Sequence, residues 1–318
     1  MSVEFVSYED KYLEGIVECL RRNFDWMADR DGDYLKKWIS PILYYTWKED
    51  ECLKNLPYLQ GLVILDADQV VGYFGVLYSV RSWKNQSVIC ANPTTWMLDE
   101  PYRLHMFRAI KMIFQGADVV VDFTPRKSVA EVLEKVFKFQ YYERECVRLY
   151  PVPYLCEDSI ELRFLSADAK GLDISLQKEY LDHSFREGIG FVFYCTKNSN
   201  EKGYIIYRVM PEGGKWIRIL KVTNKPLFAR HAHEIIWKIL RRECYDGCAD
   251  DMQALCRVME LMQDRKRVCV ECDRNFFGGE TICHPLYRGV EVRRMILNKT
   301  DLEIENPDML YSELAVLL

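Results

Sequence analysis

The sequence predicts an α+β protein in which a mixed, mostly antiparallel sheet is flanked by helices, and it predicts this arrangement twice in tandem. Three observations lead to this fold class. Strand-like runs succeed one another in residues 61–98, helices and strands alternate in residues 103–152, and a similar order of elements returns after residue 153. Short polar turns between strands favour an antiparallel meander, whereas a helix between two strands favours a parallel pair.

The bulk properties agree with a folded chain of about two domains. The chain has 318 residues, 49% of them apolar, which argues against disorder. Its net charge of −5 argues against a general attraction to nucleic acid. The acidic N-terminus does not resemble a signal peptide, and no apolar run reaches the roughly 20 residues that cross a bilayer. We therefore expect a cytoplasmic protein that binds neither nucleic acid nor membrane.

The first half begins with helices and continues with a meander. A helical period across residues 8–60 gives way to strand-like runs joined by two polar turns. These runs are GLVILD at 61–66, VVGYFGVLYSV at 70–80 and SVICANPTTWML at 87–98.

A helix, a short strand, a second helix and a final strand complete the first half. These elements are RLHMFRAIKMIF at 103–114, ADVVVDFTP at 117–125, KSVAEVLEKVF at 127–137 and FQYYERECVRLYPV at 139–152. Because a helix separates the short strand from the strand that ends at Leu98, we expect these two strands to be parallel.

Pro151 and Pro153 indicate a boundary, with domains at residues 1–152 and 153–318. Beyond it, a helical stretch near 175–185 precedes three strand-like runs and further helices, and two strands follow. The two halves share little residue identity. A tandem duplication explains the matching order of elements, and two unrelated α+β halves remain the alternative.

The 12 cysteines allow two interpretations. In a reducing compartment, free cysteines commonly act as small buried hydrophobes. The alternative is a zinc site built from Cys269, Cys272, Cys283 and His284, with Cys244 and Cys248 upstream. The run RVCVECD alternates as a strand does, so that Cys269 and Cys272 point to opposite faces. Core cysteines are the better explanation, and we expect no metal.

Three stretches of the first half resemble the GNAT (GCN5-related N-acyltransferase) superfamily. Residues 61–79 resemble its central hairpin, residues 94–103 its fourth strand running into the acyl-CoA turn, and residues 125–139 its late helix. The C-terminal LYSELAVL, at 310–317, resembles a bacterial group found with polysaccharide and surface-glycan genes. The resemblance implies tandem GNAT-like domains, the first binding acyl-CoA and the second degenerate.

The resemblance also implies a donor site. In the family, the fourth and fifth strands splay to admit pantetheine, and backbone N–H groups of the following turn bind pyrophosphate. The donor would be acetyl-CoA or another acyl-CoA. Met106 and Arg108 replace the small residues of the family's turn. The implied donor-binding residues are Trp96, Met97, Leu98, Arg103, Leu104, His105, Met106, Phe107 and Arg108.

Two carboxylates are candidates for proton transfer. Glu134 stands where the family usually has a tyrosine proton donor, and Lys138 stands at the glycine before Phe139. A glutamate could transfer protons if burial raised its pKa, although an exposed position on the helix is the ordinary alternative. Asp122 ends the strand VVVD, where its alternative role is to cap the next turn.

Three functions follow as hypotheses. The first is an acyl-CoA-dependent N-acyltransferase acting on a small-molecule amine, for example an amino sugar of a surface-glycan precursor. The second is a non-catalytic acyl-CoA-binding or scaffold protein with the same fold. The third is a transferase that takes its acyl group from aminoacyl-tRNA, against which the acidic net charge counts. The sequence does not decide the oligomeric state.

Overall fold

A computed structural model describes most of the chain as two compact units. The first unit comprises Met1–Tyr142, Arg293–Pro307 and Tyr311–Leu318, and the second comprises Glu143–Val292 and Asp308–Leu310. The predicted α+β fold class is confirmed. The described residues are 3–84, 86–150, 159–165, 174–183, 188–198, 200–210, 216–245, 253, 269–278, 280, 287–304, 309, 311–312 and 314.

The sheet of the first unit contains the predicted meander and the predicted parallel pair. Its strands lie in the order β1-β2-β3-β4-β5-β12, and all neighbours with a described register are antiparallel except the parallel pair β4–β5. The strands are β1 (Val3–Ser7), β2 (Leu62–Asp66), β3 (Gln69–Trp83), β4 (Gln86–Leu98), β5 (Val119–Asp122) and the part of β12 (Tyr287–Asn298) from Arg293 onward.

Turn chemistry explains the tight β2–β3 connection. Ala67 and Asp68 both have positive φ, 47° and 67°, which matches the twist that two-residue hairpin turns require. The sequence pattern did not predict β1, a five-residue strand that pairs with β2. None of its residues is fully buried, and Glu4 and Ser7 interrupt its apolar side chains, so no continuous apolar run marks this strand.

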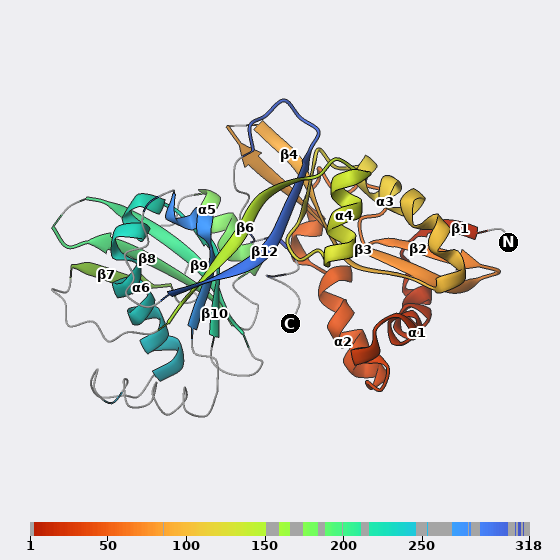
Figure 1. The fold of residues 1–318 in the computed structure, drawn as a ribbon, viewed down its shortest axis with the longest axis horizontal. Helices are drawn as coiled ribbons and strands as arrows, with labels where there is room; N and C mark the ends of the chain where they lie inside the picture. Colours follow the sequence, from red (N-terminus) through yellow and green to blue (C-terminus); the bar gives the residue numbers. More distant parts are fainter. Residues whose placement is uncertain are drawn as a thin grey trace. The chain divides into compact units, whose positions relative to one another are not determined.

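The helices of the first unit lie on both faces of its sheet (Figure 1). On one face, α3 (Met106–Gln115) and α4 (Lys127–Lys135) bury Ile110, Ile113 and Leu133 in the main apolar core. On the other face lie α1 (Leu13–Asn23) and α2 (Gly32–Leu43), whose first turn is capped by the Asp31 side chain.

Short 3-10 turns connect these helices. They are η1 (Asp10–Tyr12), η2 (Asp25–Met27), η3 (Thr46–Glu49) and η4 (Glu100–His105). The helix expected at 103–114 therefore begins as η4 and becomes α-helical only at Met106.

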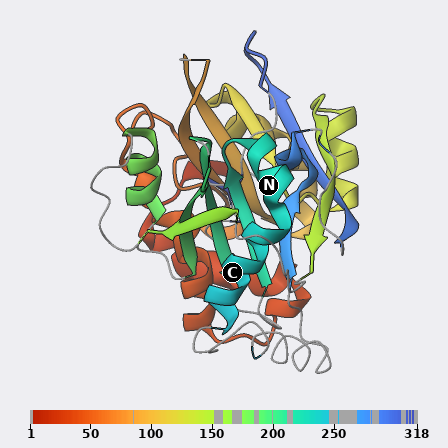
Figure 2. The same ribbon diagram turned by 90° about the vertical axis from the view of Figure 1, so that its left-hand side faces the viewer.

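In the second unit, the strands of the mixed sheet follow in the order β6-β11-β10-β9-β8-β7, and only β10 and β11 are parallel among the pairs with a described register. Helix α6 lies across this sheet (Figure 2). The elements are the part of β6 (Gln140–Leu149) from Glu143 onward, β7 (Ile160–Phe164), α5 (Ile174–His183), β8 (Ile189–Thr196), β9 (Lys202–Met210), β10 (Trp216–Val222), α6 (Lys225–Tyr245), β11 (Cys269–Asp273) and η5 (Arg274–Phe277).

One predicted strand lies in a different unit from the one expected. The run RRMILNKT, assigned from the sequence to the second half, pairs with β5 of the first unit through Met295↔Asp122 to Asn298↔Val119. The expected helix around DDMQALCRVMELM falls almost entirely outside the described residues. The functional division at residue 152 stays a prediction.

The cysteines that the structure describes are free thiols. Cys269 and Cys272 are buried in β11, whereas Cys248, Cys283 and His284, and the side chain of Cys244, lie outside the described residues. Within the described part of the chain, no group of three His, Cys, Asp or Glu side chains could hold a metal ion. None of the described helices has the length and apolar character needed to span a bilayer.

Candidate functional site

The parallel strands β4 and β5 separate soon after they meet. Their ladder consists of Cys90↔Val119 and Ala91↔Val120, although β4 continues to Leu98. At the point of separation, the Asn92 side chain donates from Nδ2 to the Val121 carbonyl oxygen at 2.8 Å. This amide replaces the next rung of the ladder, and beyond it the edge of β4 leaves β5.

A bulge interrupts β4 within the separated segment. The register against β3 shifts from Gly75↔Thr94 to Phe74↔Trp96, which leaves Thr95 as the extra residue with φ of 51°. A Cβ on Gly75 would lie 2.9 Å from the Thr94 carbonyl oxygen, so this close approach requires glycine. The bulge changes the direction of the β4 backbone where β4 has separated from β5.

A cavity of about 610 Å³ opens where the two strands separate. Residues 93–98 of β4 form one side, and Asp122 with the segment leading into α4 forms another. Arg103 and Met106 line it from the turn after β4, and aromatic residues near α2 complete the wall. All of these residues belong to the first unit.

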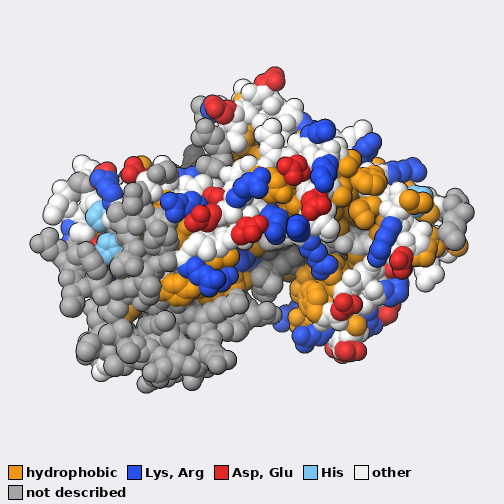
Figure 3. All heavy atoms as spheres, in the orientation of Figure 1, with side chains coloured by type: hydrophobic (Ala, Val, Ile, Leu, Met, Phe, Trp, Pro, Cys, Tyr) orange, Lys and Arg blue, Asp and Glu red, His pale blue; other side chains and the backbone are white. Residues whose placement is uncertain are grey.

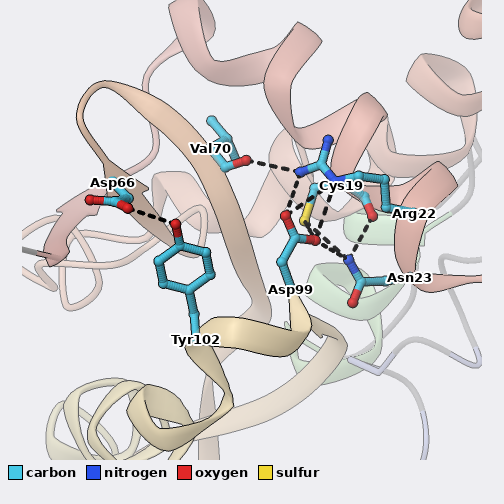
Figure 4. Close-up of polar contacts among 7 residues, drawn as sticks. All are labelled: Cys19, Arg22, Asn23, Asp66, Val70, Asp99 and Tyr102. Carbon is cyan, nitrogen blue, oxygen red and sulfur yellow. Dashed lines mark hydrogen bonds and ion pairs between the residues drawn. The ribbon is translucent and has the colours of Figure 1, made fainter. Parts of the chain in front are cut away.

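The turn after β4 is held in place by Asp99 (Figure 4). Arg22 of α1 donates to Asp99 Oδ2 at 2.8 Å and to the Val70 carbonyl oxygen at 3.1 Å, and Asn23 donates to Asp99 Oδ1 at 2.8 Å. The hydrogen bond to Asp99 raises the pKa of Arg22. A little further along, the Tyr102 hydroxyl donates to Asp66 at 2.6 Å. These contacts fix the turn against α1 and the β2–β3 hairpin.

The same cluster contains a thiol that is not reactive. Cys19 is fully buried and lies 3.8 Å from Asp99 Oδ1. Burial raises the pKa of this thiol to about 12, and the nearby carboxylate adds to the effect. Because the thiolate is the nucleophilic form, Cys19 has a structural role here.

Comparison with known proteins rests on structure, because no protein-family model matches the sequence and no curated protein is significantly similar to it. A GCN5-related N-acetyltransferase from Anabaena variabilis matches with a TM-score of 0.50 at 13% identity, covering 94% of this chain and 73% of that one. A probable N-acyltransferase of unknown function from Enterococcus faecalis matches with a TM-score of 0.50 at 10% identity and the same coverage. The chain has the GNAT fold.

Five residues of the expected donor site line the cavity. Trp96, Met97, Leu98, Arg103 and Met106 all line it. The indole Nε1 of Trp96 is buried and has no hydrogen-bond partner. An unpaired donor of this kind is costly in a closed core, and it is satisfied where a ligand can accept its hydrogen bond.

The remaining residues of the expected donor site do not line the cavity. Leu104 is 90% exposed, and Phe107 is 44% exposed and stacks on Phe137. His105 and Arg108 pack against Phe5 of β1, with centroid distances of 6.1 and 4.4 Å.

Several backbone N–H groups of the turn are absent or already bonded, so they are not free to bind a phosphate. Pro101 has no N–H, the Tyr102 N–H donates to the Asp99 carbonyl oxygen at 2.9 Å, and the Met106 N–H donates to the Arg103 carbonyl oxygen. Asp99 and Glu100 add negative charge at the start of the helical segment. The fit to a pyrophosphate is therefore partial, because it depends more on the side chain of Arg103 than on the backbone.

The two carboxylate candidates have different surroundings. Asp122 is buried, lines the cavity and accepts the Thr124 N–H at 3.1 Å, which is also the turn-capping contact expected of it. Glu134 is exposed on α4 and is not among the cavity residues. The geometry thus supports a role in the cavity for Asp122 and gives none to Glu134.

Sequence reasoning missed the aromatic wall of the cavity. Phe24, Trp26 and Trp38 line it, as does Leu314 from the C-terminal segment. The only signal was the density of aromatic residues in FDW at 24–26 and at Trp38, inside a region that reads simply as helical. The contribution of Leu314 has no local signal, because it depends on where the chain returns.

Proposed function

We propose that this chain is an N-acyltransferase that moves an acyl group from acyl-CoA to a small-molecule amine. The observation that carries the proposal is the cavity at the separation of β4 and β5, with the Thr95 bulge at its edge. A strand edge released from its ladder offers backbone groups to an extended, amide-containing arm such as pantetheine. Residues 1–152 would supply this site together with Leu314, and residues 153–318 would supply no second donor site.

The groups that line the cavity fit the needs of acyl transfer. As the new C–N bond forms, the C–S bond of the thioester breaks, and the proton lost by nitrogen ends on the departing sulfur. Backbone N–H groups near the bulge would polarise the thioester carbonyl. Asp122 would accept the proton from the amine, and Arg103 would neutralise phosphate at the mouth.

Donor binding is the first test. Calorimetry with acetyl-CoA and longer acyl-CoAs should give saturable heat, and Arg103→Glu should weaken binding at least tenfold by reversing a charge beside the phosphates. No heat with any acyl-CoA at near-millimolar concentration would contradict the proposal.

Chemistry is the second test. Asp122→Asn should lower kcat for thiol release about 10²- to 10³-fold and leave the donor affinity unchanged, because only proton transfer is lost. Glu134→Gln should keep its activity. A loss of activity in this variant would indicate that Glu134 takes part in proton transfer.

Two alternatives remain distinct outcomes. Donor binding without thiol release, across a broad panel of amines, would favour the non-catalytic acyl-CoA-binding protein. Turnover with aminoacyl-tRNA in place of acyl-CoA would favour the third hypothesis. An amino sugar as acceptor stays a prediction from the sequence resemblance.

A further inference from the structure

One wall of the cavity is an aromatic cluster that the donor does not account for. It consists of Phe24, Trp26 and Trp38, which lie at η2 and α2 rather than along β4. The rings of Trp26 and Trp38 meet edge to face at 5.8 Å, and those of Phe24 and Trp26 lie 6.4 Å apart. Trp26 is 50% exposed, and hydrophobic side chains reach the surface over α2 (Figure 3). Large aromatic faces left open at a cavity are suited to contact with a ligand.

Three of the polar side chains that line the cavity, those of Asn23, Thr94 and Thr95, already have hydrogen bonds within the protein. Asn23 donates from Nδ2 to Asp99 at 2.8 Å and to the Cys19 carbonyl oxygen at 3.0 Å. The hydroxyls of Thr94 and Thr95 lie 3.3 Å apart and bond to each other. A polyhydroxylated acceptor needs a partner for each hydroxyl that it buries, and these groups would have to break existing bonds to supply one.

Of the charged side chains that line the cavity, Arg103 is assigned to the donor, which leaves Asp122 and Arg126 beside the acceptor. Asp122 is the carboxylate among the cavity residues that the structure describes. The guanidinium of Arg126 lies 5.6 Å from the centre of the Phe24 ring. Phe24 therefore already has a cation–π contact within the protein. Electron-rich indole faces attract an ammonium group on its way to the cavity and bind a flat apolar skeleton behind it.

We propose, on the basis of the N-acyltransferase function above, that the acceptor is a primary amine carried by an aromatic ring, an arylalkylamine. Trp26 and Trp38 hold the ring of the acceptor, and the amine extends toward Asp122 and the bulge of β4. These two tryptophans therefore determine which acceptor is selected and leave the donor site unchanged.

The test compares acceptors and variants in the full chain. Thiol release from acetyl-CoA is measured with 2-phenylethylamine, tryptamine and glucosamine. The arylalkylamines should exceed glucosamine in kcat/KM about 10- to 100-fold. Trp38→Ala and Trp26→Ala should each raise KM for the arylalkylamines about tenfold, with kcat nearly unchanged.

Tyr34→Ala is the matched control on the same helix. Tyr34 is an aromatic residue of α2 that is 39% exposed, packs under Arg30 at 5.2 Å and does not line the cavity. It should leave KM for every amine unchanged. If all three variants raise KM equally, the effect is a general disturbance of α2 and the proposal is overturned.

A binding experiment separates this proposal from the proposed function. Calorimetry of 2-phenylethylamine and of glucosamine against protein saturated with CoA does not depend on turnover. Binding of 2-phenylethylamine that weakens in Trp38→Ala supports the acceptor class, even if no thiol is released and the transferase function fails. No binding of the arylalkylamine, or tighter binding of glucosamine, overturns the acceptor class, even if acyl transfer to another amine is found.

Discussion

The two units place a strand and its following helix beside a parallel strand, but they use the space beyond that pair differently. In the first unit, Met106 after β4 and Arg126 after β5 line an open cavity. In the second unit, Phe228 of α6, after β10, packs on Phe277 of η5, after β11, with ring centroids 5.4 Å apart. Both phenylalanines are fully buried, so side chains fill this space in the second unit.

The strand pairs themselves are also held together differently. Beside β4 and β5 the paired residues are small or apolar, as in Ala91↔Val120. Across β10 and β11, Arg218 bonds Glu271 at 2.9 Å, and Arg148 of β6 bonds the same carboxylate at 3.0 Å. A pair of parallel strands is therefore not enough for a ligand site, because the residues after the strands decide whether the space stays open.

The substitution with the largest expected effect on this contrast between the two units is Phe277→Ala. Removing a fully buried ring should destabilise the second unit by about 3–5 kcal/mol, because the surrounding structure closes the space only partly. Chemical denaturation measures the loss, and acyl-CoA calorimetry on the folded variant should give the wild-type affinity. Phe107→Ala, which removes a partly exposed ring, should cost less than about 1 kcal/mol. Equal losses in the two variants would mean that Phe277 does not fill the core of its unit.

Much of the first unit could be predicted because its signals are local. The alternating and apolar runs at 61–98 predicted β2, β3 and β4, and the helix before VVVD predicted the parallel pairing of β5. The position of the cavity followed from that order of elements and from the resemblance of the turn to an acyl-CoA turn.

The rest depends on contacts between distant residues. Asp99 is fixed by Arg22, which lies 77 residues earlier, and β5 takes its outer neighbour from Met295 to Asn298. No local sequence pattern predicts either contact. The same reason explains why Leu104 and Arg108 seemed equivalent to Arg103 in the sequence, although only Arg103 lines the cavity.

The second test removes the charge that bridges the sheet of the second unit. Glu271→Gln should lower stability near pH 7 by about 2–3 kcal/mol, because Arg218 and Arg148 lose a buried carboxylate that is only 6% exposed. Urea denaturation of both proteins measures the difference.

The pH dependence of this difference has a definite sign. Burial by itself raises the pKa of Glu271, but Arg218 and Arg148 outweigh it, so the folded pKa lies below the ordinary value. The stability it contributes is therefore complete above the unfolded pKa of about 4.3 and is lost as the pH falls through the folded pKa. The gap between wild type and Glu271→Gln should narrow toward about pH 3. A gap that stays constant with pH would show that the charge of Glu271 does not stabilise the sheet.

The smallest test compares two left-handed backbone positions, one in each unit. Gly278, after η5, has φ of 59°, and Lys138, before the buried Phe139, has φ of 64°. A side chain is strained in this conformation and glycine is not, so Lys138→Gly should stabilise the protein by about 0.5–1 kcal/mol, whereas Gly278→Ala should destabilise it by a similar amount. Thermal denaturation of the two variants measures both changes in stability in one experiment. Because Lys138 stands where the GNAT helix usually has glycine, a destabilising Lys138→Gly would mean that contacts such as the 3.0 Å bond from Lys138 Nζ to the Lys135 carbonyl oxygen outweigh the backbone strain.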